Sequence, residues 1–486
     1  MKKGLMISGM ALGCTAVAGC QTEQAGTPNI VFILADDLGY GDVGCYGQEK
    51  FDTPNIDSLA AHGMRFTRCY SGTTVSAPSR ACLLTGLHSG HAPVRGNIET
   101  PPEGQYPLPE MDNIFLFFKE NGYATGAFGK WGLGAPGTTG DPSNQGIDEF
   151  FGYNCQLLAH NYYPDHLWEN DRKIILEDNA DGGFGTYSQD LINEKALEFI
   201  DDNADKPFFL FLPYVLPHAE LLVPKDSILA KFSGMYPETP YKGCDSGPAF
   251  RKGGYCSQPE PRATFAAMVY RLDMYVGQVI DKLKENGILG NTLIIFASDN
   301  GPHMEGGADP DFFNSNGIFR GYKRDLYEGG IRVPFIAAWE GVIEPGSQNG
   351  HTMTFWDIFP TFRQILQPRP DTDTGRFSGG DGMSILPALT GKGSQPEHDW
   401  LYFEFQEEGG KQAVISGDMK LIRLFASSGE ASVWELYNLE NDPSETVNLL
   451  DEEHVTDEYL RIAEELRSIM EREHVPDPAW PLLQGE

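Results

Sequence analysis

Three continuous apolar runs constrain the fold of this chain more than any other feature of its sequence. They span residues 29–35, 207–213 and 293–297, and they do not alternate polar with apolar side chains. Such runs are typical of strands buried on both faces, as in parallel sheets covered by helices. The segments that alternate with them are predicted as helices over 58–63, 114–121 and 263–286 and as strands over 124–128 and 333–339. This alternation predicts an α/β fold with a large mixed, mostly parallel sheet flanked by helices.

The C-terminal part of the chain has a different pattern. Loop-like, glycine-rich stretches over 381–394 separate it from the preceding segments. Beyond them lie four short strand-like runs at hairpin spacing and one amphipathic helix: 401–405, 412–416, 421–425, 433–437 and 457–474. This order predicts a small antiparallel sheet with a C-terminal helix. We therefore divide the chain into a main domain, 28–392, and a C-terminal subdomain, 393–486.

The N-terminal residues have the features of a secretion signal. A positively charged start precedes an apolar run that is too short to span a bilayer. The ending Val-Ala-Gly-Cys at 17–20 is similar to a bacterial lipobox, which implies a signal peptide over 1–19, lipidation of Cys20 and a linker over 20–27. An ordinary signal peptide cut nearby is the alternative. We expect an exported lipoprotein, held by its lipid in the periplasm, at the outer membrane or at the cell surface.

The net charge of the chain limits its partners. A formal charge of −33 excludes nucleic acid and anionic membrane surfaces as partners. An anionic substrate would also be repelled at long range, although salt screens this repulsion. A pocket for such a substrate would have to concentrate the few cations of the chain.

The cysteines are compatible with export. None of those after Cys20 has the spacing of a zinc site. Export permits disulfides, and Cys244 with Cys256, which bracket a short glycine-rich segment, is the best candidate pair.

Two pairs of adjacent Asp or Asn residues, the acidic pairs, stand directly after buried strands. Asp36-Asp37 follows the run 29–35, and Asp299-Asn300 follows the run 293–297. In open α/β sheets ligands bind outside the carboxyl ends of the strands, so these side chains should converge on one site. Each pair alone is also common in turns and helix caps. Together they form an all-oxygen set, which favours calcium or magnesium over zinc.

The most specific motif lies at residues 76–86, which read Ser-Ala-Pro-Ser-Arg-Ala-Cys-Leu-Leu-Thr-Gly. Alone, it is also compatible with a Pro-Ser turn that caps a helix beginning near Ser79. It resembles the signature of type I sulfatases, in which the first residue is oxidised to formylglycine. Further stretches match motifs of the same family: 36–42, 53–57, 298–301, 328–334 and 437–449. The chain therefore resembles the serine-type, formylglycine-dependent carbohydrate sulfatases of bacteria, which implies an alkaline-phosphatase-like fold.

The resemblance implies a metal site and a nucleophile. Asp36, Asp37, Asp299 and Asn300 would bind one calcium ion, and the nucleophile made from Ser76 would complete its shell. A serine precursor also implies an anaerobic-type formylglycine maturase as a partner.

The resemblance also implies cationic and acidic groups around the sulfate. Arg80 lies one helical turn after Ser76, so its guanidinium can reach back to the same site. Lys130 and Lys323 resemble the two sulfate-binding lysines of the family. His218 resembles the histidine that assists the leaving group, and an imidazole can protonate the departing alcohol.

One position departs from the family pattern. The family usually has a histidine two residues after its first lysine, and this chain has Gly132 there. His303 and His160 are the candidate replacements: we expect His303, near Asn300 in the sequence, to point into the space left at Gly132, and His160 to contact the sugar. Structural histidines are the alternative for both. Arg320, in the charged stretch that includes Lys323, is a further predicted substrate-binding residue.

By resemblance, the chain is expected to hydrolyse sulfate esters on a sulfated glycan. The stretches 129–134 and 159–164 look most like those of glycan sulfatases, and the resemblance favours 4-O-sulfated galactose or N-acetylgalactosamine as the sugar. A phosphomonoesterase or phosphodiesterase of the alkaline phosphatase superfamily is the enzymatic alternative, because it shares the metal residues at the strand ends. A catalytically inactive, glycan-binding lipoprotein is the alternative from another class.

Overall fold

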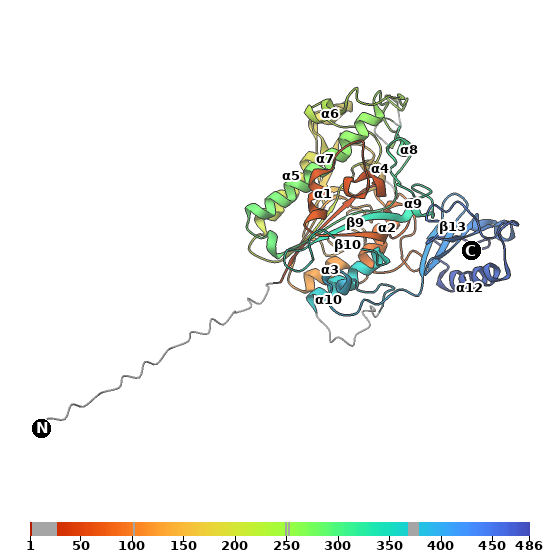
Figure 1. The fold of residues 1–486 in the computed structure, drawn as a ribbon. Coiled ribbons are helices and arrows are strands. Elements are labelled where there is room, and N and C mark those ends of the chain that lie inside the picture. Colours follow the sequence, from red (N-terminus) through yellow and green to blue (C-terminus); the bar gives the residue numbers. More distant parts are fainter. Residues whose placement is uncertain (2–26, 101–102, 248–249, 251–252, 368–378) are drawn as a thin grey trace.

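The computed structural model describes residues 1, 27–100, 103–247, 250, 253–367 and 379–486 (Figure 1). Its main element is an 11-stranded mixed sheet with the spatial order β10-β2-β9-β8-β1-β7-β3-β4-β5-β6, in which β11 pairs with β2. The strands are β1 (Asn29–Ala35), β2 (Met64–Tyr70), β3 (Ala124–Lys130), β4 (Glu149–Tyr153), β5 (His166–Glu169), β6 (Arg172–Ile175), β7 (Phe208–Pro213), β8 (Thr292–Ser298), β9 (Arg332–Ala338), β10 (Ser347–Asn349) and β11 (Met353–Thr354). Neighbouring strands from β8 to β4 pair in parallel, and antiparallel pairs occur toward both edges. The mixed, mostly parallel sheet predicted from the sequence is confirmed.

Helices cover both faces of this sheet (Figure 1). One face packs against α1 (Pro54–Ala61), α5 (Ser188–Asp202) and α7 (Pro261–Glu285). The other face packs against α2 (Ser76–Thr85), α3 (Ile114–Glu120) and α10 (Ile358–Leu366). Shorter helices lie in the connections: α4 (Gln156–Ala159), α6 (Ser227–Phe232), α8 (Pro310–Phe313), α9 (Glu328–Ile331) and α11 (Leu386–Thr390).

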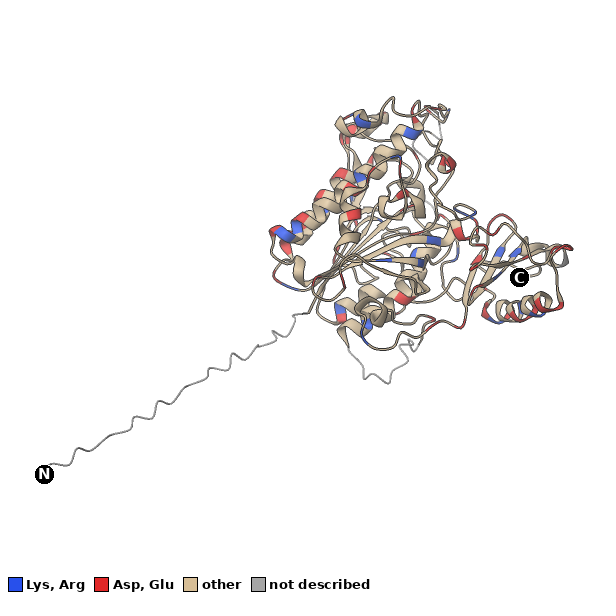
Figure 2. Ribbon diagram, in the orientation of Figure 1, with Lys and Arg blue, Asp and Glu red and all other residues tan. Residues whose placement is uncertain are grey.

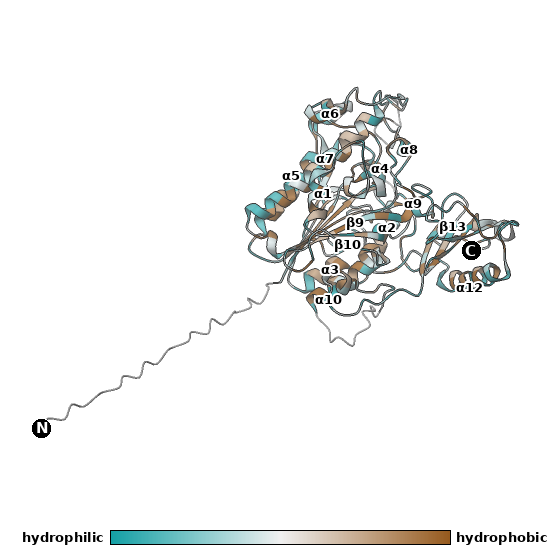
Figure 3. Ribbon diagram, viewed as in Figure 1, coloured by the Kyte–Doolittle hydropathy of each residue, from teal (hydrophilic) through white to brown (hydrophobic). Residues whose placement is uncertain are grey.

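Burial on two faces explains why β1 is apolar throughout. Val31 and Ile33 belong to the core on the α7 side, whereas Ile30, Phe32 and Leu34 belong to the core on the α3 side. All of them are at most 1% exposed, and each such side chain contributes about 1.5–3 kcal/mol relative to an exposed one. Figure 3 shows the same distribution, with hydrophobic residues on the central strands and hydrophilic residues along the outer helices.

The C-terminal unit is a 4-stranded antiparallel sheet, as predicted. It comprises β12 (Leu401–Phe405), β13 (Lys411–Ser416), β14 (Met419–Leu424) and β15 (Val433–Asn438), and α12 (Asp457–Glu473) follows it. Leu466 and Met470 of α12 pack on one face of this sheet. The other face packs against residues of the main domain, among them Tyr70 and Trp356.

A buried charge cluster joins the two units. The Nζ of Lys420, on β14, lies 2.9 Å from carboxylate oxygens of both Glu328 and Glu445. Glu328 also accepts hydrogen bonds from Tyr70 at 2.8 Å and from Arg332 at 3.1 Å. The side chains of Lys420, Glu328 and Glu445 are all 0% exposed, so these charges depend on one another.

Several expectations differ from the structure or lie outside it. The first predicted helix begins at Pro54 instead of residue 58, because proline is well suited to the first turn. Cys244 remains a thiol that faces the carbonyl oxygen of Ser246 at 3.3 Å, so the expected bridge to Cys256 is not formed. The predicted signal peptide, Cys20 and almost all of the 20–27 linker lie outside the described residues. In the part of the chain that the structure describes, no helix is both long and apolar enough to cross a bilayer. The boundary at 392/393 stays a prediction.

The charge cluster predicts a strong effect of Lys420→Met on stability. This change removes the cation that contacts both Glu328 and Glu445, and breaking a buried pair costs about 3–5 kcal/mol. Chemical denaturation measures the loss. A second change, Glu445→Gln, should restore part of it, because the amide carries no charge. As a matched control, Lys282→Met breaks an exposed pair with Asp201 and should change stability little. A single Lys420→Met variant as stable as this control would contradict the argument.

Candidate active site

The two acidic pairs meet at the carboxyl edge of the sheet. Asp36 and Asp37 follow β1, and Asp299 and Asn300 follow β8, its parallel neighbour. The backbone N–H of Asp37 donates to Oδ1 of Asp299 at 3.1 Å, and Nδ2 of Asn300 donates to Oδ1 of Asp37 at 2.7 Å. All four side chains are 0% exposed. The topology thus brings together residues that are about 260 positions apart.

Helix α2 carries the Ser76 motif into this cluster. Ser76 is the first residue of the helix, and its Oγ donates to Oδ1 of Asp36 at 2.9 Å. Arg80, one turn further on, is buried, and its guanidinium donates to Oδ2 of Asp299 at 2.9 Å and to Oδ2 of Asp36 at 3.2 Å. It also donates to the carbonyl oxygen of Lys130. Arg80 thus contacts Asp36, the carboxylate that also accepts the hydrogen bond from Ser76.

Lys130 enters from the end of β3. Its Nζ donates to Oδ2 of Asp36 at 2.6 Å and to Oγ of Ser76 at 3.4 Å. Burial lowers the pKa of Lys130. Burial alone would raise the pKa of Asp36, but neighbouring cations, Lys130 foremost, hold it well below its usual range. Burial and the charge of Asp36 raise the pKa of Asp299 to about 7.

A second lysine contacts the other side of the carboxylate cluster. Nζ of Lys323 donates to Oδ2 of Asp37 at 2.9 Å and to Nε2 of His218 at 3.1 Å. Nδ1 of His218 donates to the carbonyl oxygen of Ala219, so the neutral ring presents its lone pair at Nε2. Burial and the charge of Lys323 lower the pKa of His218 well below its ordinary value. Glu305 also approaches Lys323, at 3.7 Å, a contact that no sequence motif indicated.

His160 and His303 both stack on His218. Their ring centroids lie 5.0 Å and 5.9 Å from it, with interplanar angles of 19° and 26°. Both nitrogens of His303 are engaged, since Nε2 donates to the Pro217 carbonyl at 3.1 Å and Nδ1 accepts from the Glu305 N–H at 3.1 Å. Nδ1 of His160 has no partner among the described residues. Burial and the charge of Lys130 lower the pKa of His160 to about 4, so its ring is neutral at neutral pH.

Arg320 lies at the junction with the C-terminal sheet. Its guanidinium donates to the hydroxyl groups of Tyr437 at 3.0 Å and Tyr327 at 3.1 Å and to the carbonyl oxygen of Glu445 at 2.9 Å. These contacts give Arg320 a structural role. Its expected part in substrate binding stays a prediction.

Gln156 is a site residue that sequence reasoning missed. A Cβ atom at Gly132 would lie 2.5 Å from Nε2 of Gln156, so the Gln156 amide covers this glycine. Gly132 has a φ of +69°, a conformation that favours glycine. The departure at Gly132 indicated that some group should lie there, but no local motif identified Gln156. The expectation that His303 fills this space is wrong, because His303 bonds to the Pro217 carbonyl and no atom of it lies within 4 Å of a Cβ at Gly132.

The donor set fits a hard divalent cation. Carboxylate and amide oxygens are the ligands that calcium and magnesium prefer. Oδ1 of Asn300 is buried and has no hydrogen-bond partner among the described residues, which leaves it available to a cation. The charges of the cluster also suit one: Asp36, Asp37 and Asp299 balance Arg80, Lys130 and Lys323. A bound dication would leave an excess positive charge that attracts an anion.

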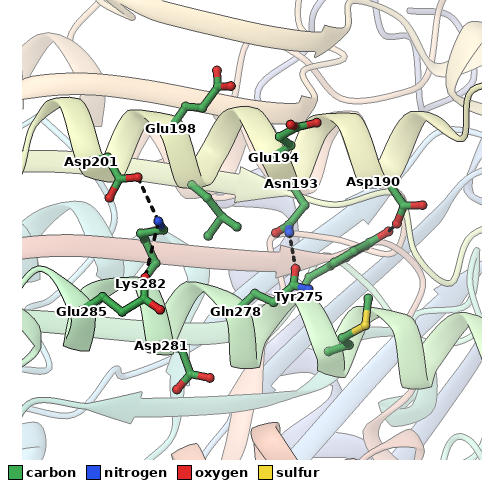
Figure 4. Close-up of a pocket in the computed structure, with 12 residues that line it drawn as sticks. Asp190, Asn193, Glu194, Glu198, Asp201, Tyr275, Gln278, Asp281, Lys282 and Glu285 are labelled. Carbon is green, nitrogen blue, oxygen red and sulfur yellow. Dashed lines mark hydrogen bonds and ion pairs between the residues drawn. The ribbon is translucent and has the colours of Figure 1, made fainter.

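Acidic charge lies mostly on outer elements, away from this cluster. Figure 2 shows acidic residues along α5, α7 and α12. Between α5 and α7 lies a hollow of about 640 Å³ (Figure 4), whose acidic lining residues are Asp190, Glu194, Glu198, Asp201, Asp281 and Glu285. Such a surface repels anions, whereas the cluster at the strand ends, once it held a dication, would attract them at short range. This distribution resolves the conflict between a net charge of −33 and an anionic substrate.

Comparison with known proteins gives a consistent assignment. The sulfatase family matches residues 28–367, and the family described as N-sulphoglucosamine sulphohydrolase, C-terminal, matches residues 317–473. Arylsulfatase A of Homo sapiens is 30% identical over 87% of this chain and 83% of its own length. N-acetylgalactosamine-6-O-sulfatase of Bacteroides thetaiotaomicron is 28% identical over 96% of this chain and 97% of its own. The structure of Ps i-CgsB in complex with k-i-k-neocarrahexaose superposes with a TM-score of 0.74 and 28% identity, covering 94% of this chain and 95% of that one. On this evidence the chain belongs to the sulfatase family and is a sulfuric ester hydrolase with an alkaline-phosphatase-like fold.

Proposed function

We propose that this sulfatase removes sulfate from a sugar of a sulfated glycan, with a nucleophile made by oxidation of Ser76 to formylglycine. The observation that carries the proposal is the position of Ser76, whose Oγ contacts both the metal-site carboxylate of Asp36 and the ammonium of Lys130. When hydrated, the aldehyde group supplies one hydroxyl to attack sulfur and a second hydroxyl whose proton loss releases sulfate.

The cations of the site act on the transferring sulfuryl group. Lys130 and Arg80 flank the nucleophile position, and Lys323 approaches from the opposite carboxylate. Preorganised donors of this kind stabilise charge as it develops in a buried site. Asp36 accepts the Ser76 hydrogen bond and so orients the nucleophile toward them.

Lys323 and His218 together supply a proton to the leaving group. The ammonium of Lys323 already donates to Nε2 of His218 at 3.1 Å, so the pair holds one transferable proton. The leaving alcohol oxygen takes this proton as its bond to sulfur breaks. Because His218 is neutral, its Nε2 can accept the proton from Lys323 and transfer it to the leaving oxygen.

We propose calcium as the metal, held by Asp36, Asp37, Asp299 and Asn300. When bound, the ion supplies Lewis-acid stabilisation of a sulfate oxygen. The all-oxygen donor set and the free Oδ1 of Asn300 support this choice over zinc.

The substrate proposal is supported by the names of related proteins. N-acetylgalactosamine-6-sulfatases occur among the relatives, and one structural neighbour is complexed with a neocarrahexaose. We propose a galactose or N-acetylgalactosamine residue as the sulfated sugar. The sequence predicts the 4-O ester, whereas these relatives are named for the 6-O ester, and assays with the two isomers distinguish them.

The phosphatase alternative is disfavoured by the position of Lys323. Ligand atoms of Asp37, His303 and Glu305 lie within 4.8 Å of one another, as a second metal site would require. The Lys323 ammonium lies between them, 2.9 Å from Asp37 and 3.7 Å from Glu305. A fixed monovalent cation therefore takes the place where a two-metal phosphatase would need its second ion.

We also propose that the chain is an exported lipoprotein, lipidated at Cys20 and matured by an anaerobic-type formylglycine maturase. The lipobox-like ending at 17–20 and the serine at position 76 support these two steps.

The nucleophile proposal predicts a specific mass change. The peptide that contains Ser76, isolated from active protein, should lack two hydrogen atoms relative to the encoded serine, because the alcohol is oxidised to an aldehyde. Mass spectrometry of the protein made with and without an anaerobic-type maturase checks this, and Ser76→Ala should be unmodified and inactive. A fully active protein with an intact serine would overturn the mechanism.

The metal proposal predicts that chelation abolishes turnover and that calcium restores it better than zinc. Calcium should also stabilise the folded protein, by about 2.7 kcal/mol at 100 times its Kd. Thermal denaturation with and without calcium measures this shift. Asp299→Ala should lose both the shift and the activity. The control Asp418→Ala, which breaks a surface contact with Arg68, should retain both. An Asp299→Ala variant that still responds to calcium would place the metal elsewhere.

The proton proposal predicts that the effect of His218→Ala depends on the leaving group. Sugar sulfates should slow by about 100-fold or more, because general acid catalysis contributes on this scale. Aryl sulfates with acidic phenols should slow far less, since their leaving groups need little protonation. Equal slowing of both classes would instead indicate a role of His218 in binding sulfate.

A further inference from the structure

The segment 154–160 contains an unusual group of unpartnered polar atoms. It follows β4 and includes α4 (Figure 1). Both side-chain polar atoms of Asn154, Nε2 of Gln156 and Nδ1 of His160 are buried, and no hydrogen-bond partner is found for them among the described residues. An unsatisfied buried group typically costs about 1–3 kcal/mol, and native proteins retain few of them. Several in one short segment indicate that a ligand supplies the missing partners.

One end of this segment lies against the Lys130 side of the active site. Tyr153, at the end of β4, pairs in register with Lys130 of β3. Beyond this pair the segments that follow β3 and β4 remain adjacent, because the N–H of Gly132 donates to the carbonyl oxygen of Asn154 at 3.1 Å. Nε2 of Gln156 covers the α-carbon of Gly132, and Gly132 is two residues from the lysine that contacts Ser76.

The other end of the segment lies against His218. His160 directly follows α4 as its C-cap residue, and its ring stacks on the His218 ring with a centroid separation of 5.0 Å. A backbone hydrogen bond with Gly253 acts to raise the pKa of His160, so the ring donates there. Because Nδ1 has no partner, the donor to Gly253 is Nε2, and Nδ1 carries the lone pair. His160 therefore presents a hydrogen-bond acceptor, which matches a hydroxyl group and not a sulfate oxygen.

We infer that segment 154–160 is a substrate-recognition strip in which Gln156 donates to the sulfate ester and His160 accepts a hydrogen bond from a sugar hydroxyl. This inference rests on the proposed function. Gln156 thereby supplies the hydrogen-bond donor that Gly132 lacks. One end of the strip binds the sulfate group, and the other end binds the sugar.

The stability of the ligand-free protein distinguishes a ligand-binding role of the Gln156 amide from a structural role. Gln156→Met keeps the size of the side chain and removes an unsatisfied amide, so the ligand-free protein should gain thermal stability. Gln145→Met is the matched control: Gln145 is 1% exposed, but its amide donates to Thr139 at 2.8 Å and accepts from Asn113 at 2.8 Å, so this variant should lose stability. A Gln156→Met variant that loses stability as Gln145→Met does would show that the Gln156 amide has a structural partner and would overturn the inference.

Binding and turnover test the ligand assignment. In calcium-loaded protein, Gln156→Met should weaken the binding of inorganic sulfate, measured by calorimetry, by about tenfold or more, the usual scale for a hydrogen bond to a charged group. It should lower kcat/KM for a glycan sulfate and an aryl sulfate alike. His160→Phe, which keeps the ring stacked on His218, should lower kcat/KM for the glycan by a larger factor than for the aryl sulfate. Unchanged sulfate binding in Gln156→Met, or equal effects of His160→Phe on both substrates, would overturn the corresponding half of the inference.

A variant at Gly132 displaces the Gln156 amide without changing Gln156 itself. In Gly132→Ala the new Cβ would lie 2.5 Å from Nε2 and would displace the amide, so sulfate binding should weaken as in Gln156→Met. The two changes should not add in the double variant, because they disturb one contact. Full additivity would place the amide elsewhere. Failure of the wild type to hydrolyse any sulfate ester would reject the proposed function, whereas the stability and sulfate-binding measurements would still decide the role of Gln156.

Discussion

The neutralisation of three buried carboxylates by three buried cations is the interaction on which the rest of this structure depends. The pairs are formed by Asp36, Asp37 and Asp299 with Arg80, Lys130 and Lys323. An unpaired charge at such depth costs several kcal/mol, so each element that brings one of these side chains must be held accurately in place. Strands β1, β3 and β8 end at the same edge of the sheet, and helix α2 begins there. Under the proposed function, the same cations that neutralise the carboxylates would also bind the sulfate oxygens.

Sequence patterns predicted the parts of the fold that follow simple periodic rules. The apolar run of β1 is buried on both faces, and the acidic pairs after β1 and β8 converge because parallel neighbours end together. Short strands such as β5 and β6, each of 4 residues, are too brief and too exposed to leave a clear pattern, and they were not predicted. The one-turn spacing from Ser76 to Arg80 was sufficient to predict their common site, because a helix fixes that geometry. Gln156 could not be found in this way: its position over Gly132 depends on how the connection after β4 folds back, which no local pattern encodes.

In the proposed one-metal mechanism, the ammonium of Lys323 takes the place of a second metal ion. Its ammonium contacts Asp37 and approaches Glu305, a pair of carboxylates that could otherwise bind a second cation. A lysine differs from a metal ion in two ways: it cannot be lost to solution, and it can exchange a proton. In the proposed mechanism, the contact with Nε2 of His218 uses the second property, because a proton held between two nitrogens would be available to a leaving oxygen. A metal ion in this place would stabilise charge but would not itself supply that proton.

The position of Lys323 also explains why the C-terminal sheet is part of the enzyme. Lys323 lies on the stretch between Arg320 and Glu328, and both ends of this stretch are tied to the C-terminal unit. Arg320 donates to Tyr437 of β15 at 3.0 Å, and Glu328 pairs with the buried Lys420 of β14 at 2.9 Å. Between these anchors, Nζ of Lys411 on β13 donates to the carbonyl oxygen of Arg324 at 2.7 Å, next to Lys323 itself. Three strands of the small sheet thus hold one loop, and under the proposed function the side chain that they position would act on the sulfate at the edge of the large sheet. Loops that carry function on a rigid support are a general arrangement, and here the support is a second sheet.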